Sequence, residues 1–358
     1  MGVKEWMQES IEEFFTHWPE PTQEQCDQKA SSLFDSSSIT PIGMQGSLSY
    51  TLLASTIISF RVPEAKLGSD VEKLARKIHG AVVPEATFRG KLEARNEENK
   101  PLYIYTMPFL RGQTCLETTP FVPQLSEEQI AKHINYVQLL ARFFARNWLN
   151  PQKVDAKELQ LPRDDIKHKL TLLENDERFA YMDHAIKDRR GPRGIDLLFS
   201  EAYPQVLTHG DFSGTNILLD GDDHSITGLI DWSLAGIKPF GMELFALRST
   251  SGNMNGNGYS DYTCRDITDG AFWDEFWKVT KVEDNKARET IKTHAELACK
   301  MGLILAYAFT KTLDGKALDV LDSRPTRFLY EWLKRPRWSD IVLRETDRPT
   351  PSNEVGEA

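Results

Sequence analysis

The spacing of apolar residues over the first 38 positions is that of an amphipathic helix. Ile11, Phe14, Phe15 and Trp18 recur at close to helical spacing, with charged and amide residues between them. The stretch "WPEPTQEQ" interrupts this pattern with two prolines. We therefore expect residues 1–38 to form a helical N-terminal extension, broken once, that packs on the body of the protein.

After this extension the chain changes to short runs that suit β-strands. Residues 41–62, "PIGMQGSLSYTLLASTIISFRV", are rich in Ser, Thr and Ile around two glycines, which predicts two strands and a turn. Residues 70–80 place apolar positions on one helical face and end at a glycine, as helices often do. Strand patterns follow at 81–93 and 101–109. This order predicts a small antiparallel sheet with one helix over residues 39–110.

Beyond this sheet, helical patterns dominate. Two short apolar runs, 217–219 and 226–230, interrupt them, and the turn residues "DGDDHS" between the runs predict a β-hairpin. The tail, residues 346–358, is acidic and contains proline, which predicts disorder. We expect an α+β chain in which residues 111–345 form the larger, mainly helical unit. Its predicted helices cover residues 126–147, 163–180, 194–203, 270–279, 287–309 and 325–333.

Composition narrows the possible functions. The chain has 358 residues, with 43 lysines and arginines against 53 aspartates and glutamates, and its net charge of −10 argues against nucleic acid as a partner. The four cysteines lie far apart without a CxxC pair, which favours a reduced intracellular protein without structural zinc. The N-terminus lacks a signal-peptide pattern, and no uncharged apolar run reaches the roughly 18 residues of a membrane span. We expect a cytoplasmic protein with no membrane attachment and no obligate protein partner.

Three polar side chains in the segment "THGDFSGTNILLDGDDHSITGLIDW" have a spacing that suggests chemistry. Asn216 follows Asp211 by five positions, and Asp231 follows Asn216 by fifteen, at the end of the returning strand. A hairpin brings its two ends together, so Asn216 and Asp231 should lie close in space. Amide and carboxylate oxygens suit Mg²⁺, and Asp211 beside the metal could orient a hydroxyl and accept its proton. The alternative, an Asp-rich turn beside an ordinary hairpin, leaves the spacing unexplained.

The motif "HGDFSGTNILL" followed by "IDW" resembles the catalytic and metal-binding loops of the aminoglycoside phosphotransferase and choline kinase-like family. This family is related to the protein kinases, in which the corresponding motifs are HRDxxxxN and DFG. The resemblance implies a bilobal protein kinase-like fold. It makes Asp211 the catalytic acid or base, and Asn216 and Asp231 the ligands of the metal that bridges the nucleotide phosphates. His209 is expected to support the loop. A Trp-Ser pair stands where protein kinases have Phe-Gly, which puts activation-segment switching in doubt.

The resemblance also indicates how the nucleotide phosphates would be held. The stretch "GMQGSLSY" resembles the family's loop over the phosphates, with Gly46, Ser47 and Ser49 as candidates, because small residues let backbone N–H groups approach anionic oxygens. It lacks a full GxGxxG, and a simple hairpin turn is the alternative. Arg61 in "TIISFRV" stands where protein kinases place a lysine and would offer a permanently charged fork to phosphate oxygens. An exposed arginine at a strand end is the competing interpretation.

Two further parts of a nucleotide site are expected near Arg61. Its partner on the following helix would be Asp70 or Glu72 in "GSDVEKLAR", and the sequence alone does not choose between them. The segment "YTMPFLRG" is interpreted as the hinge, where backbone groups around Met107 to Phe109 would pair with the adenine edge. A buried strand running into a turn would have the same pattern.

The acceptor is the least constrained part of the prediction. In kinases of this type, an insert before the catalytic loop, here 176–205, and the later helices build the acceptor pocket. Acidic and tryptophan residues at 253–277 would suit a cationic amine or sugar, but a solvated acidic loop followed by a core-facing aromatic stripe is the favoured interpretation. These residues are Asp261, Asp266, Asp269, Trp273, Asp274, Glu275 and Trp277.

The sequence as a whole looks most like phosphotransferase-family proteins of filamentous fungi. The resemblance implies an ATP- and Mg²⁺-dependent phosphotransferase that acts on a hydroxyl of a small molecule. Two alternatives remain: a nucleotide-binding pseudokinase or scaffold without turnover, and a protein kinase, against which the Trp of "IDW" and the absence of a recognisable APE segment argue.

Overall fold

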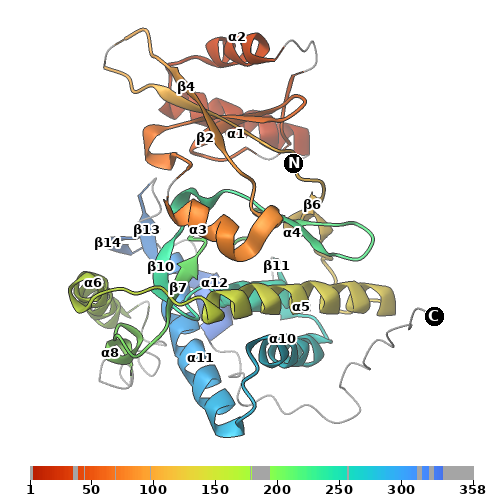
Figure 1. The fold of residues 1–358 in the computed structure, drawn as a ribbon, viewed down its shortest axis with the longest axis vertical. Helices are drawn as coiled ribbons and strands as arrows, with labels where there is room; N and C mark the ends of the chain where they lie inside the picture. The colour runs from red at the N-terminus through yellow and green to blue at the C-terminus, as the bar shows by residue number, and fades with distance from the viewer. Residues whose placement is uncertain are drawn as a thin grey trace.

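The computed structural model describes residues 3–34, 39–43, 45–68, 70–96, 98–177, 179, 194–255, 258–312, 317–321 and 326–333. Figure 1 shows two lobes, a smaller one built on an antiparallel sheet and a larger one that is mainly helical. The predicted α+β, bilobal fold class is therefore confirmed. Residues 180–193, within the predicted insert, and the tail 346–358 lie outside the described residues.

The smaller lobe contains a five-stranded antiparallel sheet of order β1-β2-β3-β5-β4. Its middle strands are rich in β-branched and aromatic residues and bury most of their side chains. Helix α3, Asp70–His79, follows β3, and Gly80 with φ of +75° ends it. The strands are β1 Thr40–Pro41, β2 Ser49–Leu53, β3 Ile57–Arg61, β4 Thr87–Leu92 and β5 Leu102–Met107.

The N-terminal extension forms two helices, α1 Val3–His17 and α2 Gln23–Leu33, as predicted. The hydroxyl of Thr22 caps α2 by accepting from the Gln25 backbone N–H, while the Gln25 side chain accepts from the Thr22 backbone N–H. Apolar residues of both helices share one core with the sheet, so the extension covers the sheet of the smaller lobe (Figure 1). The fully buried members of this core include Ile11, Phe14, Cys26, Ala30, Tyr50, Leu52, Ile58, Phe60 and Ile104.

The larger lobe is organised around helices α5, Glu127–Leu149, and α10, Arg265–Thr280, which pack against each other. Their aromatic side chains, such as Phe144 and Phe272, meet at ring-centroid distances near 6.1 Å in the main core. The other helices of the lobe are α4 Cys115–Thr118, α6 Ala156–Glu174, α8 Ile195–Leu198, α9 Phe245–Thr250, α11 Asn285–Tyr307 and α12 Thr326–Leu333.

Short strands join the helices of the larger lobe. They form a three-stranded sheet of order β6-β8-β9 and three antiparallel pairs: β7 with β10, β11 with β12, and β13 with β14. The bounds are β6 Gln113–Thr114, β7 Gln205–Thr208, β8 Ile217–Leu219, β9 Ile226–Leu229, β10 Gly236–Pro239, β11 Gly252–Asn255, β12 Gly258–Asp261, β13 Phe309–Lys311 and β14 Ala317–Leu321.

Three predicted helices of this lobe are wrong in extent. Helix α10 begins at Arg265 rather than at 270. Helix α6 begins at Ala156 rather than at 163, because the Asp155 carboxylate caps it by accepting from two backbone N–H groups, and Pro162 is accommodated inside the helix. The helix expected over 194–203 is only the four residues of α8, and strand β7 follows. Apart from the 217–230 hairpin, the strands of this lobe were not predicted, because two to five residues are too few to establish a period.

The acidic and aromatic residues at 253–277 belong mainly to the core. Trp273 and Trp277 are 4% and 5% exposed and pack against Phe276. Glu275 pairs with an arginine of α5, and Asp269 pairs with Arg265, while burial raises the pKa of Asp269 to about 6. The core-facing stripe is therefore the correct interpretation of these two tryptophans. In the part of the chain that the structure describes, no helix is both long and apolar enough to cross a bilayer.

Candidate active site

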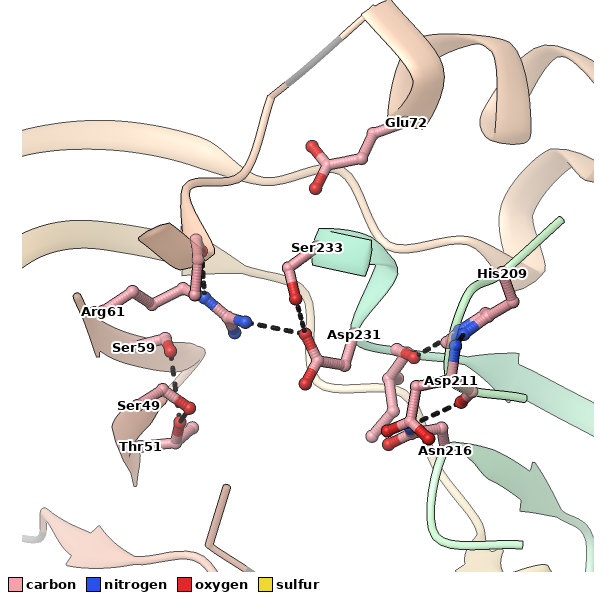
Figure 2. Close-up of polar contacts among 12 residues, drawn as sticks. Ser49, Thr51, Ser59, Arg61, Glu72, His209, Asp211, Asn216, Asp231 and Ser233 are labelled. Carbon is pink, nitrogen blue, oxygen red and sulfur yellow. Dashed lines mark hydrogen bonds and ion pairs between the residues drawn. The ribbon is translucent and has the colours of Figure 1, made fainter. Parts of the chain in front are cut away.

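The predicted hairpin brings Asn216 and Asp231 together. Strands β8 and β9 pair with Ile217 opposite Leu229, and the next backbone bond runs from the Ile230 N–H to the Asn216 carbonyl at 3.0 Å. Asp231 follows directly, so both polar side chains lie at the same end of the hairpin (Figure 2). The hairpin geometry inferred from the spacing is confirmed.

The amide of Asn216 fixes the loop that carries Asp211. Its Nδ2 donates to the Asp211 backbone carbonyl at 2.9 Å and to the Asp211 carboxylate Oδ2 at 3.0 Å. Asn216 is buried, whereas Asp211 is exposed and borders a large cavity. With the nitrogen committed to Asp211, the amide oxygen of Asn216 is the group left to meet a cation.

Asp231 is held in a left-handed backbone conformation, with φ of 61° and ψ of 64°. Its Oδ1 accepts from Arg61 Nη2 at 2.6 Å and from Ser233 Oγ at 2.9 Å (Figure 2). Burial by itself raises the pKa of the Asp231 carboxyl, but the Arg61 charge and these two hydrogen bonds outweigh burial and hold the pKa below its usual value. Asp231 is therefore ionised at neutral pH.

The oxygen atoms at this end of the hairpin fit a magnesium ion. One carboxylate oxygen of Asp231 is engaged with Arg61 and Ser233, and the structure records no hydrogen bond to its other oxygen, Oδ2, from the described residues. Together with the Asn216 amide oxygen it gives two hard ligands, the small protein share that Mg²⁺ takes when phosphates and water supply the rest. Among the described residues no group of three or more His, Cys, Asp or Glu side chains is arranged for a metal.

His209 is a buried brace of the loop. Its ring Nε2 lies 2.8 Å from the Ile230 carbonyl oxygen, and its ring centroid is 4.6 Å from that of Trp232. Trp232 in turn stacks on His79 of α3 at 5.8 Å, which links that helix to the Asp231 end of the hairpin. This placement supports the structural role expected for His209.

Glu243 is a site-supporting residue that the sequence analysis missed. Its carboxylate accepts from the His209 backbone N–H at 2.7 Å and from the Gly210 backbone N–H at 2.5 Å, and the side chain is buried. A buried carboxylate must be paired or hydrogen-bonded, and here it anchors the residues just before Asp211. The signal available in the sequence was a single acid among the apolar residues of "PFGMELFAL".

The loop also requires a glycine at position 210. Gly210 has φ of +87°, and a Cβ there would lie 1.9 Å from the Leu234 carbonyl oxygen. We expect Gly210→Ala to destabilise the protein by about 3 kcal/mol or more, because left-handed strain adds to a backbone clash. Urea unfolding measures the effect. Gly236→Ala is the matched control, since nothing lies within 4 Å of its added Cβ. Equal losses in both variants would contradict the clash.

The expected partner of Arg61 is wrong. Arg61 is 4% exposed and pairs with Asp231, while its Nε donates to the Ala65 carbonyl at 2.7 Å. Of the two acids expected on α3, Asp70 pairs with Lys73 at the surface, and Glu72 accepts from the Gly68 backbone N–H. The reason is geometric: β3 ends beside the hairpin, so the carboxylate of Asp231 meets the guanidinium first (Figure 2).

The loop before β2 has the expected form of a turn with exposed small residues. Gly46 and Ser47 are exposed, and Gln45 supports the turn by exchanging hydrogen bonds with the Thr51 backbone. Ser49 is buried opposite Arg61 in the sheet, and its hydroxyl accepts from the Thr51 hydroxyl at 3.4 Å. Gly46 and Ser47 thus remain accessible to a ligand, whereas the Ser49 side chain is used within the sheet.

One backbone group of the segment predicted as the hinge already forms a hydrogen bond within the protein. Met107 ends β5, and its backbone carbonyl accepts from the Thr56 hydroxyl at 2.5 Å. The Phe109 side chain is 51% exposed, just after the sheet. The Met107 carbonyl is therefore engaged, whereas the two residues after it, Pro108 and Phe109, are exposed.

Comparisons with known proteins identify the family of the chain. The sequence pattern described as the phosphotransferase enzyme family matches residues 73–266, which include Asp211, Asn216 and Asp231. The GDP complex of wild-type aminoglycoside 2'-phosphotransferase-IIIa has a TM-score of 0.50 at 15% identity, over 80% of this chain and 91% of that chain. A Plasmodium vivax ethanolamine kinase has a TM-score of 0.43 at 14% identity, over 77% of each chain. No curated protein sequence matches the chain.

The matched region covers more than half of the 358 residues and runs from α3 into α10. It contains the hairpin, the loop that carries Asp211 and the buried Glu243 that anchors that loop. The chain belongs to the phosphotransferase enzyme family.

Proposed function

We propose that this protein transfers the γ-phosphoryl group of ATP, with Mg²⁺, to a hydroxyl group of a small molecule. The observation that carries the proposal is the arrangement at the end of the hairpin. There the Asn216 amide is fixed on Asp211 and the ionised Asp231 lies beside it, so two oxygen ligands adjoin an exposed carboxylate. Phosphoryl transfer needs this combination of a held metal–nucleotide and a positioned proton acceptor.

Each residue has a distinct role in the proposed reaction. Asp211 orients the acceptor hydroxyl and accepts its proton as the oxygen attacks the γ-phosphorus. Asn216 and Asp231 would hold Mg²⁺, which when bound neutralises charge on the β- and γ-phosphates. Arg61, already at the edge of this site through Asp231, would offer its guanidinium to phosphate oxygens.

The nucleotide would lie between the loop before β2 and the hinge after β5. The exposed Gly46 and Ser47 would offer backbone N–H groups to the phosphates, and backbone groups between Met107 and Phe109 would meet the adenine edge. Ser49 would support that loop from within the sheet. The four cysteines are buried free thiols, and we propose a reducing compartment, the cytoplasm, for this reaction.

One observation favours an alternative, a nucleotide-binding protein without turnover. Arg61 is engaged with Asp231 at 2.6 Å, on the carboxylate that would hold the metal. If that ion pair were permanent, the metal role of Asp231 would be reduced. Two observations support turnover instead: Asp211 is exposed, and no described residue has a recorded hydrogen bond to Asp231 Oδ2.

A turnover assay separates these functions. Purified protein with ATP and Mg²⁺ is expected to form ADP faster when a suitable hydroxyl compound from a panel of sugars, amino alcohols and hydroxy acids is added. Chelation of Mg²⁺ should stop the reaction. A thermal shift with ATP and Mg²⁺ but no acceptor-dependent ADP would identify the binding protein without turnover. If neither response occurred, the proposed function would be wrong.

A further inference from the structure

A large cavity is lined by Asp211 and by residues of β10, β13 and α6. Figure 1 shows these three elements on the same side of the larger lobe. The volume of the cavity is about 1030 Å³, at the upper end of the range usual for small-molecule sites. Asp211 lies on its wall together with the following residues Phe212, Ser213 and Gly214. A hydroxyl compound that reaches Asp211 would therefore occupy this cavity.

Two lysines from different strands line the cavity. Lys238 belongs to β10 and Lys311 to β13; both line the cavity and are exposed. Neither ammonium group forms an ion pair with any residue that the structure describes. Partial desolvation at the cavity wall lowers the pKa of Lys311, Asp211 raises it and Lys238 lowers it, so the three charges lie close enough to influence one another. A cationic environment therefore faces the carboxylate that would take the proton.

Three acids on the cavity wall form ion pairs or hydrogen bonds with other groups. Asp165 pairs with Lys169 at 2.5 Å, and Asp70 pairs with Lys73. Glu243 accepts the two backbone N–H groups that anchor the catalytic loop. Glu158 and Lys153 also line the cavity; both are exposed, and their charges are opposite. Apart from Asp211, the exposed Glu158 is therefore the one acid among the described residues that line the cavity for which no such partner is recorded.

The remaining wall is apolar and aromatic. Phe245 and Tyr307 meet edge to face at 6.2 Å, and Ile237, Met242 and Leu305 also face the cavity. Burial, followed by the charge of Asp211, raises the pKa of Tyr307 to about 12, so its hydroxyl stays protonated. The cavity thus offers an apolar surface, two positive charges and one proton acceptor.

We propose that the acceptor is an anionic hydroxy compound with an apolar or aromatic body, whose carboxylate pairs with Lys238 and Lys311 while its hydroxyl meets Asp211. This inference rests on the proposed function. In the reaction the acceptor oxygen forms a bond to the γ-phosphorus, the bond between that phosphorus and the bridging oxygen breaks, ADP leaves and the hydroxyl proton passes to Asp211. A cationic amine would be repelled by the positive charges of the two lysines.

The test uses two matched series of acceptors that differ in charge. One is 3-phenyllactate, its amide and phenylalaninol; the other is 2-hydroxy-4-methylpentanoate, its amide and leucinol. Each member has one alcohol hydroxyl and an apolar body, and the charge runs from negative through neutral to positive. Binding is measured by saturation-transfer NMR with a non-hydrolysable ATP analogue and Mg²⁺, and turnover by acceptor-dependent ADP formation. We expect the anionic member to bind roughly tenfold or more tightly than the cationic member.

Charge reversal of each lysine tests the assigned contacts. Lys311→Glu and Lys238→Glu are each expected to weaken binding of the anionic member roughly tenfold or more, with the KM for ATP unchanged. Lys286→Glu on α11 is the control, because it makes the same change in net charge at an exposed site outside the cavity. The control should leave the order of the series intact.

The outcomes separate this inference from the proposed function. Preference for the cationic member, binding by no member, or a change in the KM for ATP alone in the lysine variants would contradict the anionic acceptor. Phosphorylation of a neutral or cationic member would then still support the proposed function. Conversely, lysine-dependent binding of the anionic member without any ADP formation from ATP and Mg²⁺ would support the anionic site and contradict turnover.

Discussion

Replacing Asp211 with asparagine is expected to remove most phosphoryl transfer while leaving ATP and Mg²⁺ binding close to that of the parent. The Asn216 amide donates to the Asp211 carboxylate at 3.0 Å and to its backbone carbonyl at 2.9 Å. An asparagine at 211 can accept the same hydrogen bonds through its amide oxygen, so the loop should keep its conformation. What it cannot do is accept the acceptor's proton. We expect turnover to fall roughly 10²- to 10⁴-fold, the usual contribution of general base catalysis.

Acceptor-dependent ADP formation measures the loss, and the ATP-induced thermal shift checks binding. The control is Asp222→Asn, which makes the same chemical change at an exposed residue of the hairpin turn. The control should retain parental turnover. Near-normal turnover of Asp211→Asn would show that another group takes the proton, and loss of ATP binding would mean that Asp211 acts mainly by holding the nucleotide complex.

The hairpin and its polar ends could be predicted because their information is local. Asn216 and Asp231 are connected through a single turn, so strand alternation and turn composition sufficed to place them side by side. The N-terminal helices were also predictable, because two prolines interrupt the helical pattern between them. In each case the decisive residues lie within about 20 positions of one another, a distance over which periodicity and turn chemistry are informative.

Contacts between distant segments could not be predicted in the same way. Arg61 meets Asp231 across 170 positions of sequence, and no local pattern favours Asp231 over the nearer acids of α3. Glu243 finds the backbone of Gly210 only because the chain returns through β10, a four-residue strand too short to show a period. The choice of ion-pair partner depends on which charges the tertiary fold brings within reach.

The two lysines of the cavity beside Asp211 likewise come from distant segments whose proximity the sequence does not predict. Lys238 and Lys311 belong to two short strands in different sheets, and nothing in either stretch of sequence relates one to the other. The tryptophans at 273 and 277, by contrast, drew attention through composition and proved to lie in the core. Composition identified residues that could bind a cation, but their direction on α10 was decided by packing against α5.

A substitution at Asp231 is expected to weaken the metal–nucleotide complex itself. Asparagine is the sharper replacement, because residue 231 has φ of 61° and asparagine tolerates the left-handed region better than alanine does. Asp231→Asn keeps the side-chain size and an acceptor for Ser233 but removes the negative charge. We expect ATP affinity in Mg²⁺ to fall roughly tenfold or more, since Mg²⁺ binding depends on carboxylate charge. Asp231→Ala should bind at least as poorly and also lose stability through backbone strain.

The loss of the Arg61 ion pair must be separated from the loss of the metal ligand, because Asp231 takes part in both. Arg61→Met removes the ion pair and leaves the carboxylate, so it should weaken ATP binding while the Mg²⁺ concentration needed for half-maximal turnover stays near the parental value. Asp231→Asn should raise that Mg²⁺ concentration. If Asp231→Asn matched the parent in both ATP affinity and Mg²⁺ dependence, its carboxylate would serve Arg61 alone. If both variants raised the Mg²⁺ requirement equally, the metal would depend on the ion pair that orients Asp231 rather than on its Oδ2 directly.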